Sequence, residues 1–228
     1  MYAFAPVLAE TVSFPQSSFA PLAVGFFGLA TGYLIYGPEE LFRLPGRTRA
    51  VDLTTGIWGV FMPGVMQLLT GIYLFVGLTW FNSFRSKTLY MTALAFTAYG
   101  VHWLALGLAR VLGGDPRPNA FMSVSFIFLS VLGIVVFFRA HDNPVGGLFI
   151  GLTLVYVSDF FASLFLRPPR AASIEPAVAS PTTRLEPSVL SELGERALGF
   201  FHLGTGLWLI YLTYAAVLNI ASGMDLPL

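Results

Sequence analysis

The sequence predicts an all-α membrane protein built as a bundle of six transmembrane helices. Of its 228 residues, 56% are hydrophobic and only 11% are charged, whereas soluble domains carry about 25% charged residues. The hydrophobic residues gather in runs close to the roughly 20 residues that a helix needs to cross a bilayer. These runs lack the period-two alternation of transmembrane strands. Because only helices satisfy their backbone hydrogen bonds within each segment, we expect every run to be helical.

The apolar runs define one transmembrane domain over residues 19–222, between an N-terminal segment 1–18 and a C-terminal tail 223–228. The six predicted helices cover residues 19–37, 54–80, 88–112, 119–138, 144–166 and 197–221. Residues 167–195, before the last helix, are rich in proline, alanine, serine and threonine. That composition predicts a loop, in which Ser188–Gly194 could form a short helix.

The first two helices contain glycines, a proline and a glutamine that bear on packing or function. Gly28 and Gly32 stand four residues apart on the first helix, a spacing that favours close packing of helices in lipid; a pore-lining glycine face is the alternative. Pro63 interrupts the second helix and predicts a kink, because it removes a backbone hydrogen bond. Gln67 follows at the predicted midplane. It either hydrogen-bonds to a neighbouring helix or faces a pore.

The third, fourth and fifth helices contain the remaining candidates for polar function. Tyr99 and His102 lie in the middle of an apolar run, where such residues usually face a protein interior or a cavity. Asn119 is the expected N-cap of the fourth helix. Asp159, the one acid inside an apolar run, lies near a helix end. We expect it at the membrane interface, with a proton relay as the alternative.

Composition and motifs argue against several classes of protein. The absence of cysteine excludes disulfides and thiolate metal sites, and a formal net charge of zero gives no reason to expect nucleic acid binding. The motifs of nucleotide-binding proteins, zinc proteases and serine hydrolases are missing. His102 and His202 could meet inside the bundle and hold a metal or a porphyrin, but satisfied interior histidines are commoner. We therefore expect no enzyme, no catalytic residue, no cofactor and no metal.

Several short motifs resemble, in the same order, those of the acetate uptake transporter family, the YaaH/SatP-like proteins. The similarity extends over about residues 20–222. The matching residues are Ala20-Pro-Leu22 with Phe27-Gly28, Gly59, Gly64, Gln67 and Gly71, Ala95-Phe-Thr-Ala-Tyr-Gly100 with Trp103, Pro118-Asn119-Ala120, Leu152-Thr153, and Ile210-Tyr-Leu212 with Val217-Leu-Asn219.

The resemblance implies a six-helix channel for acetate or a similar small monocarboxylate, with the architecture of acetate and urea channels. It also implies a hexamer in a bacterial inner membrane, each protomer having its own pore. The family's hydrophobic constriction maps onto Phe27, Tyr99 and Leu152, and Leu209 falls where the family tunes substrate size. Further pore-lining or substrate contacts are expected from Gln67, His102 and Asn119.

The sequence departs from the family pattern at several places. Ser18 replaces a signature asparagine, Leu74 replaces an acid, and the loop before the last helix is longer. The first, third and fifth loops hold nine arginines, whereas the termini and the other loops hold three basic residues. This bias favours both termini outside the cytoplasm, whereas the resemblance implies both termini inside. The alternative function is therefore a transporter-derived accessory or scaffold subunit of a larger respiratory or photosynthetic membrane complex, with unlike membrane subunits as partners.

Overall fold

The computed structural model describes residues 21–166 and 187–228, and in this part of the chain all regular secondary structure is helical. Residues 1–18 and most of the predicted loop 167–195 lie outside the described residues. The elements are α1 (Leu22–Phe42), α2 (Arg49–Gly59), the π-helix η1 (Val60–Val65), α3 (Met66–Thr79), α4 (Thr88–Leu112), α5 (Pro118–Arg139), α6 (Asn143–Leu164) and α7 (Val189–Ser222).

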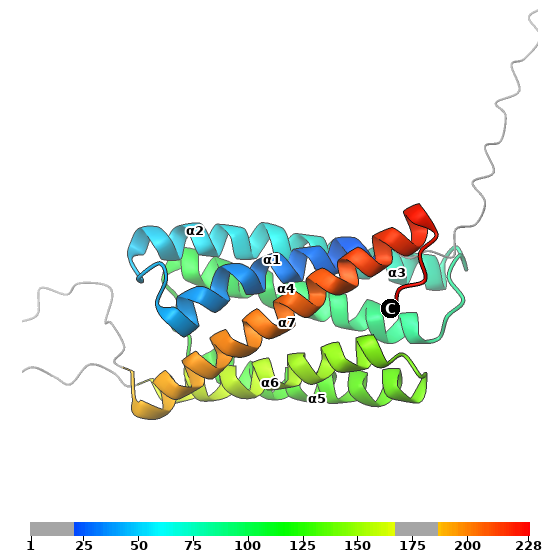
Figure 1. The fold of residues 1–228 in the computed structure, drawn as a ribbon. Coiled ribbons are helices and arrows are strands. Elements are labelled where there is room, and N and C mark those ends of the chain that lie inside the picture. Colours follow the sequence, from blue (N-terminus) through cyan, green and yellow to red (C-terminus); the bar gives the residue numbers. More distant parts are fainter. Residues whose placement is uncertain (1–20, 167–186) are drawn as a thin grey trace, which may run out of the picture.

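The helices form a bundle in which α7 crosses the others diagonally (Figure 1). Extensive contacts join α1 to α7, α5 to α6 and α6 to α7, and α3 packs on α4. α2, η1 and α3 follow one another as a single helical segment, Arg49–Thr79. The predicted kink corresponds to η1, where Pro63 stands inside a π-helical stretch. Such a stretch is a common response to a missing backbone donor.

Several helix starts differ from the sequence-based expectation, and α2 begins at Arg49 where residue 54 was predicted. α1 begins at Leu22 and continues past Pro38 to Phe42. α5 begins at Pro118, which suits the first helical position, so Asn119 lies in the first turn and is not the N-cap. α7 begins at Val189, because Ser188 and Ser191 form a reciprocal capping box there. The predicted short helix at Ser188–Gly194 is thus the start of α7.

Five helical segments in the described residues are long and apolar enough to cross a membrane, namely Arg49–Thr79, α4, α5, α6 and α7. α1 has 21 residues but ends in a turn with two glutamates and is not among the five. Large apolar side chains, including Phe121 and Phe128 of α5, are exposed on the outside of the bundle. Apolar side chains on that surface suit contact with lipid tails, which are themselves apolar.

Candidate functional site

Two cavities lie inside the bundle. The first, which we call the apolar constriction, has a volume of about 20 Å³, close to that of a single water probe. It is lined by Phe26, Leu29, Gln67, Thr92, Ala95, Phe96, Tyr99, Val145, Leu148, Phe149, Leu152 and Leu209. The second, which we call the polar chamber, has a volume of about 270 Å³ and reaches the loops that connect α1 to α2 and α4 to α5.

The apolar constriction brings Tyr99, Leu152 and Leu209 together, but it does not include Phe27. The Phe27 side chain is 44% exposed on the outside of the bundle, whereas its neighbour Phe26 is 3% exposed and lines the cavity. The rotation of α1 about its own axis explains why Phe26 lines the cavity and Phe27, the predicted constriction residue, does not. A Cβ atom on Gly28 would approach the backbone oxygen of Met62, and one on Gly32 would meet Pro63. The glycine face therefore packs on η1, which turns Phe26 inward.

The Tyr99 hydroxyl is bonded within the bundle. Its oxygen lies 2.9 Å from Ser130 Oγ, and Ser130 Oγ lies 2.7 Å from the backbone carbonyl oxygen of Phe126. Because a carbonyl can only accept, Ser130 donates to Phe126, and Tyr99 therefore donates to Ser130. Neither Gln67 nor His102 is the partner of this hydroxyl.

An aromatic cluster separates the apolar constriction from the polar chamber. The rings of Tyr99 and Tyr156 stack with centroids 5.7 Å apart, and Phe126 stacks on Tyr156 at 4.9 Å. His102 packs on Phe126 at 5.1 Å. Tyr99 lines the constriction, whereas His102 and Tyr156 line the chamber. The two cavities are thus neighbours that share one aromatic wall.

Gln67 differs from the other polar side chains of the apolar constriction, because it has no hydrogen-bond partner. Its side chain is 0% exposed, and neither the amide nitrogen nor the amide oxygen has a hydrogen-bond partner among the described residues. The interhelical hydrogen bond, which was one interpretation of this residue, is not formed. Gln67 instead lines the same cavity as Phe26 and Tyr99.

The polar chamber is lined by several acids and by two histidines, His102 and His202. His202 Nδ1 of α7 lies 2.6 Å from Glu40 Oε2 of α1, and both side chains are buried. Asp159 accepts hydrogen bonds from Ser123 at 2.6 Å and from Ser163 at 3.1 Å. Asp159 lies near the C-terminal end of α6, as expected, and its carboxylate faces the chamber inside the bundle. Two serines, one on α5 and one a turn further along α6, hold it there.

His102 and Asn119 also line the polar chamber. His102 and His202 thus share one cavity, as the sequence allowed. Among the described residues, no group of three or more histidine, cysteine, aspartate or glutamate side chains is arranged to hold a metal ion. His202 is instead paired with Glu40 and stacked on Tyr33 with centroids 4.4 Å apart.

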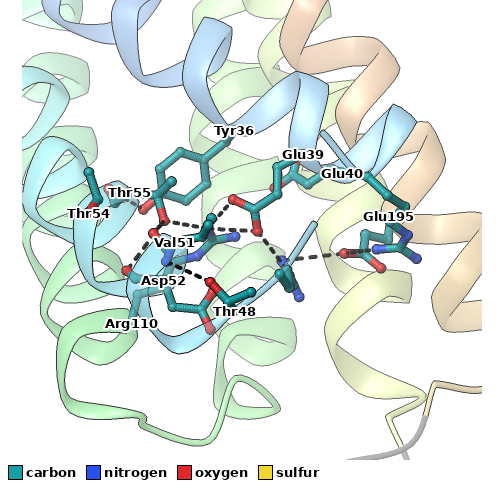
Figure 2. Close-up of polar contacts among 12 residues, drawn as sticks. Tyr36, Glu39, Glu40, Thr48, Val51, Asp52, Thr54, Thr55, Arg110 and Glu195 are labelled. Atoms are coloured by element: carbon teal, nitrogen blue, oxygen red, sulfur yellow. Dashed lines mark hydrogen bonds and ion pairs between the residues drawn. The ribbon is translucent and has the colours of Figure 1, made fainter. Parts of the chain in front are cut away.

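A charged network joins Arg110 and Glu195 of the chamber wall to Glu39 and its neighbours (Figure 2). Glu39 at the end of α1 is fully buried and lies 2.7 Å from Arg47 Nε and 2.9 Å from Arg110 Nη1. Arg110 also donates to Thr55 Oγ1 at 3.0 Å and lies over the Tyr36 ring, 4.1 Å from its centroid. The network therefore joins the ends of α1, α2 and α4.

Two further arginines of this end, Arg43 and Arg49, are also engaged. Arg43 and Arg47 approach Glu195 Oε1 of α7 at 2.6 and 3.4 Å. Arg49 donates to the backbone carbonyls of Arg110 and Val111, at 3.1 and 2.5 Å. Although burial opposes its charge, the carboxylates of Glu195 and Glu39 raise the pKa of the Arg47 guanidinium above its usual value. Each of the three described arginines in the chamber wall is thus engaged, Arg47 and Arg110 by Glu39 and Arg49 by backbone carbonyls.

Most of this network was not predicted from the sequence. Arg47 and Arg110 entered only the count of loop arginines, and Glu39 and Glu40 were not considered. A usable signal was the pair of adjacent glutamates at the end of an apolar run, because buried acids require partners.

Comparison with solved structures finds a match that covers most of this chain. A structure described as the bacterial acetate channel SatP superposes with a TM-score of 0.61 and 20% sequence identity, covering 92% of this chain and 98% of that chain. The fold is that of SatP. No known protein family matches the sequence itself, and no curated protein sequence does.

The match to SatP confirms, at the level of the fold, the resemblance to SatP-like proteins that short motifs had indicated. Together with the five apolar helical segments, it identifies the chain as an integral membrane protein. The alternative of an accessory subunit in a respiratory or photosynthetic complex gains no support from it. At 20% identity, this similarity shows the fold alone.

Proposed function

We propose that this protein is a membrane channel for acetate or a similar small monocarboxylate. The observation that supports this most is the apolar constriction, which adjoins a polar chamber inside a bundle with the SatP fold. In this proposal α1 is the sixth membrane-spanning helix, the membrane is the bacterial inner membrane, and the protein forms a homo-oligomer with one pore in each protomer.

Phe26, Tyr99, Leu152 and Leu209 form the selective part of this path. Apolar constrictions of this kind select by size and by exclusion of water. With a volume of about 20 Å³, the constriction is closed to any solute larger than water, so passage requires the side chains to move. The chamber, with His102 and Asn119 in its wall, keeps the solute hydrated on one side of this barrier.

Phe26 and Phe27 provide a matched test. In liposomes, we expect the protein to take up labelled acetate faster than empty liposomes do. Phe26→Ala should widen the constriction and admit longer and branched monocarboxylates several-fold faster, because Phe26 lines the cavity. Phe27→Ala removes the same ring from the outer surface and should leave selectivity unchanged. Equal changes in the two variants would refute the constriction, and wild-type uptake no faster than empty liposomes would refute the channel.

The orientation of the channel is a separate prediction, based on the arginine count. We expect the end with the polar chamber to face the cytoplasm and the C-terminal end to face outward. The chain has no cysteine, so a single introduced cysteine is the one thiol of the protein that a reagent can label. An impermeant thiol reagent added to intact cells should label Met224→Cys but not Gly46→Cys, a site with no atom within 4 Å of an added Cβ. Labelling of Gly46→Cys alone would reverse the orientation.

A further inference from the structure

Gln67 presents an unusual combination in the apolar constriction, a fully buried primary amide with both of its polar atoms free. Its side chain is 0% exposed, and neither Nε2 nor Oε1 has a partner among the described residues. Buried polar groups are nearly always hydrogen-bonded, because leaving one unsatisfied is unfavourable. An amide that folding leaves unpaired beside a cavity can therefore bind a solute once the side chains of the constriction move apart to let it pass.

The hydroxyl groups of the other polar side chains in the constriction already donate hydrogen bonds within the protein. The Thr92 hydroxyl donates to the Thr88 carbonyl at 3.2 Å, and Tyr99 donates to Ser130. The lining contains no lysine, arginine or histidine. Gln67 therefore supplies the one free donor of the lining side chains, next to a free acceptor on the same amide group.

We propose that Gln67 binds the permeating molecule in its neutral form, as an undissociated carboxylic acid held by a pair of hydrogen bonds. The acid carbonyl accepts from Nε2–H, and the acid O–H donates to Oε1. This inference rests on the proposed function and names the species that the constriction admits. A primary amide such as acetamide presents the same donor and acceptor side by side, and it serves as a probe that does not ionise.

A carboxylate anion fits this site poorly. It can only accept hydrogen bonds, so it would leave Oε1 of Gln67 without a donor and bring like partial charges together. No basic side chain in the lining would offset its charge, and transfer of an unpaired charge into an apolar cavity is strongly unfavourable. The polar chamber does not attract the anion either. Glu40 and Asp159 lie in its wall, and its arginines are paired with acids or with backbone carbonyls.

The first test removes the amide. Gln67→Leu keeps an apolar side chain of similar size, and Leu69→Ala, on the outside of α3, is the matched control. Uptake of labelled acetate and of acetamide is measured in liposomes, and uptake by empty liposomes is subtracted. We expect Gln67→Leu to lower both fluxes about tenfold, as expected for lost hydrogen bonds, and Leu69→Ala to lower neither. The thermal midpoint of Gln67→Leu should be equal or higher, because an unsatisfied buried amide is removed.

The second test identifies the permeating species. Acetate flux is measured in buffer pairs that hold the undissociated acid constant while pH raises the anion concentration. We expect protein-dependent flux to follow the acid. The inference is overturned if flux follows the anion, if Gln67→Leu lowers acetate flux but not acetamide flux, or if the wild type conducts acetate but not acetamide. If the wild-type protein conducts neither acetate nor acetamide, the proposed channel function itself is overturned. The outcomes named before it overturn only the role of Gln67 and the neutral acid.

Discussion

Replacing Glu39 by leucine is expected to lower the free energy of unfolding by about 3–5 kcal/mol, the usual effect of removing one partner of a buried ion pair. The Glu39 side chain is 0% exposed and faces two guanidinium groups, those of Arg47 and Arg110. Arg110 is itself largely buried, over the ring of Tyr36. Without Glu39 it would keep its charge in a poorly solvated place, which is the main source of the loss.

The Glu39→Leu variant is compared with the wild type by thermal unfolding of the purified protein in detergent. Asp115→Ala is the matched control, because Asp115 and Arg117 form an equally short ion pair of 2.6 Å with both side chains 44% exposed. Hydrogen bonds from Arg117 lower the pKa of Asp115, but exposed pairs contribute little to stability. We expect the control to keep the wild-type midpoint. Similar midpoints for both variants would show that the buried network does not hold the helix ends together.

The positions of the long helices could be predicted because the bilayer imposes them. An apolar run of about 20 residues has few alternatives to a helix, and α4 covers the same residues, Thr88–Leu112, in the prediction and in the structure. Helix ends were harder to predict, because they depend on local caps. Pro118 and the Ser188–Ser191 pair decide where α5 and α7 begin, and neither contributes to an apolar pattern.

The rotation of each helix could not be predicted, because distant neighbours determine it. Phe26 and Phe27 are chemically identical, and only the approach of Gly28 to Met62 shows which ring faces the cavity. The polar chamber was missed for the same reason. Glu40 and His202 are 162 positions apart in the chain and meet only because α1 packs along α7. Tyr99 and Gln67 were found correctly as interior residues, because polar groups in apolar runs have little choice of environment.

The close approach of α2 and α4 gives the second large prediction. Gly107 of α4 faces Gly56 of α2, and a Cβ atom on Gly107 would lie 2.6 Å from Gly56 O and 2.8 Å from Val60 N. Backbone atoms cannot move aside as a flexible side chain can, so the helices themselves must separate. Gly107→Ala is therefore expected to lower the free energy of unfolding by about 1–3 kcal/mol or more.

The control for Gly107→Ala is Gly204→Ala in α7, where an added Cβ would have nothing within 4 Å. Alanine favours a helix over glycine by up to about 1 kcal/mol, so this variant should unfold at the same temperature or higher. The two substitutions add the same methyl group to a helix interior and are expected to change stability in opposite directions. Separation of α2 from α4 should also draw Arg110 away from Thr55, which joins these helices through a 3.0 Å hydrogen bond. If thermal unfolding finds both variants equally tolerated, the glycine contact is not what sets the distance between α2 and α4.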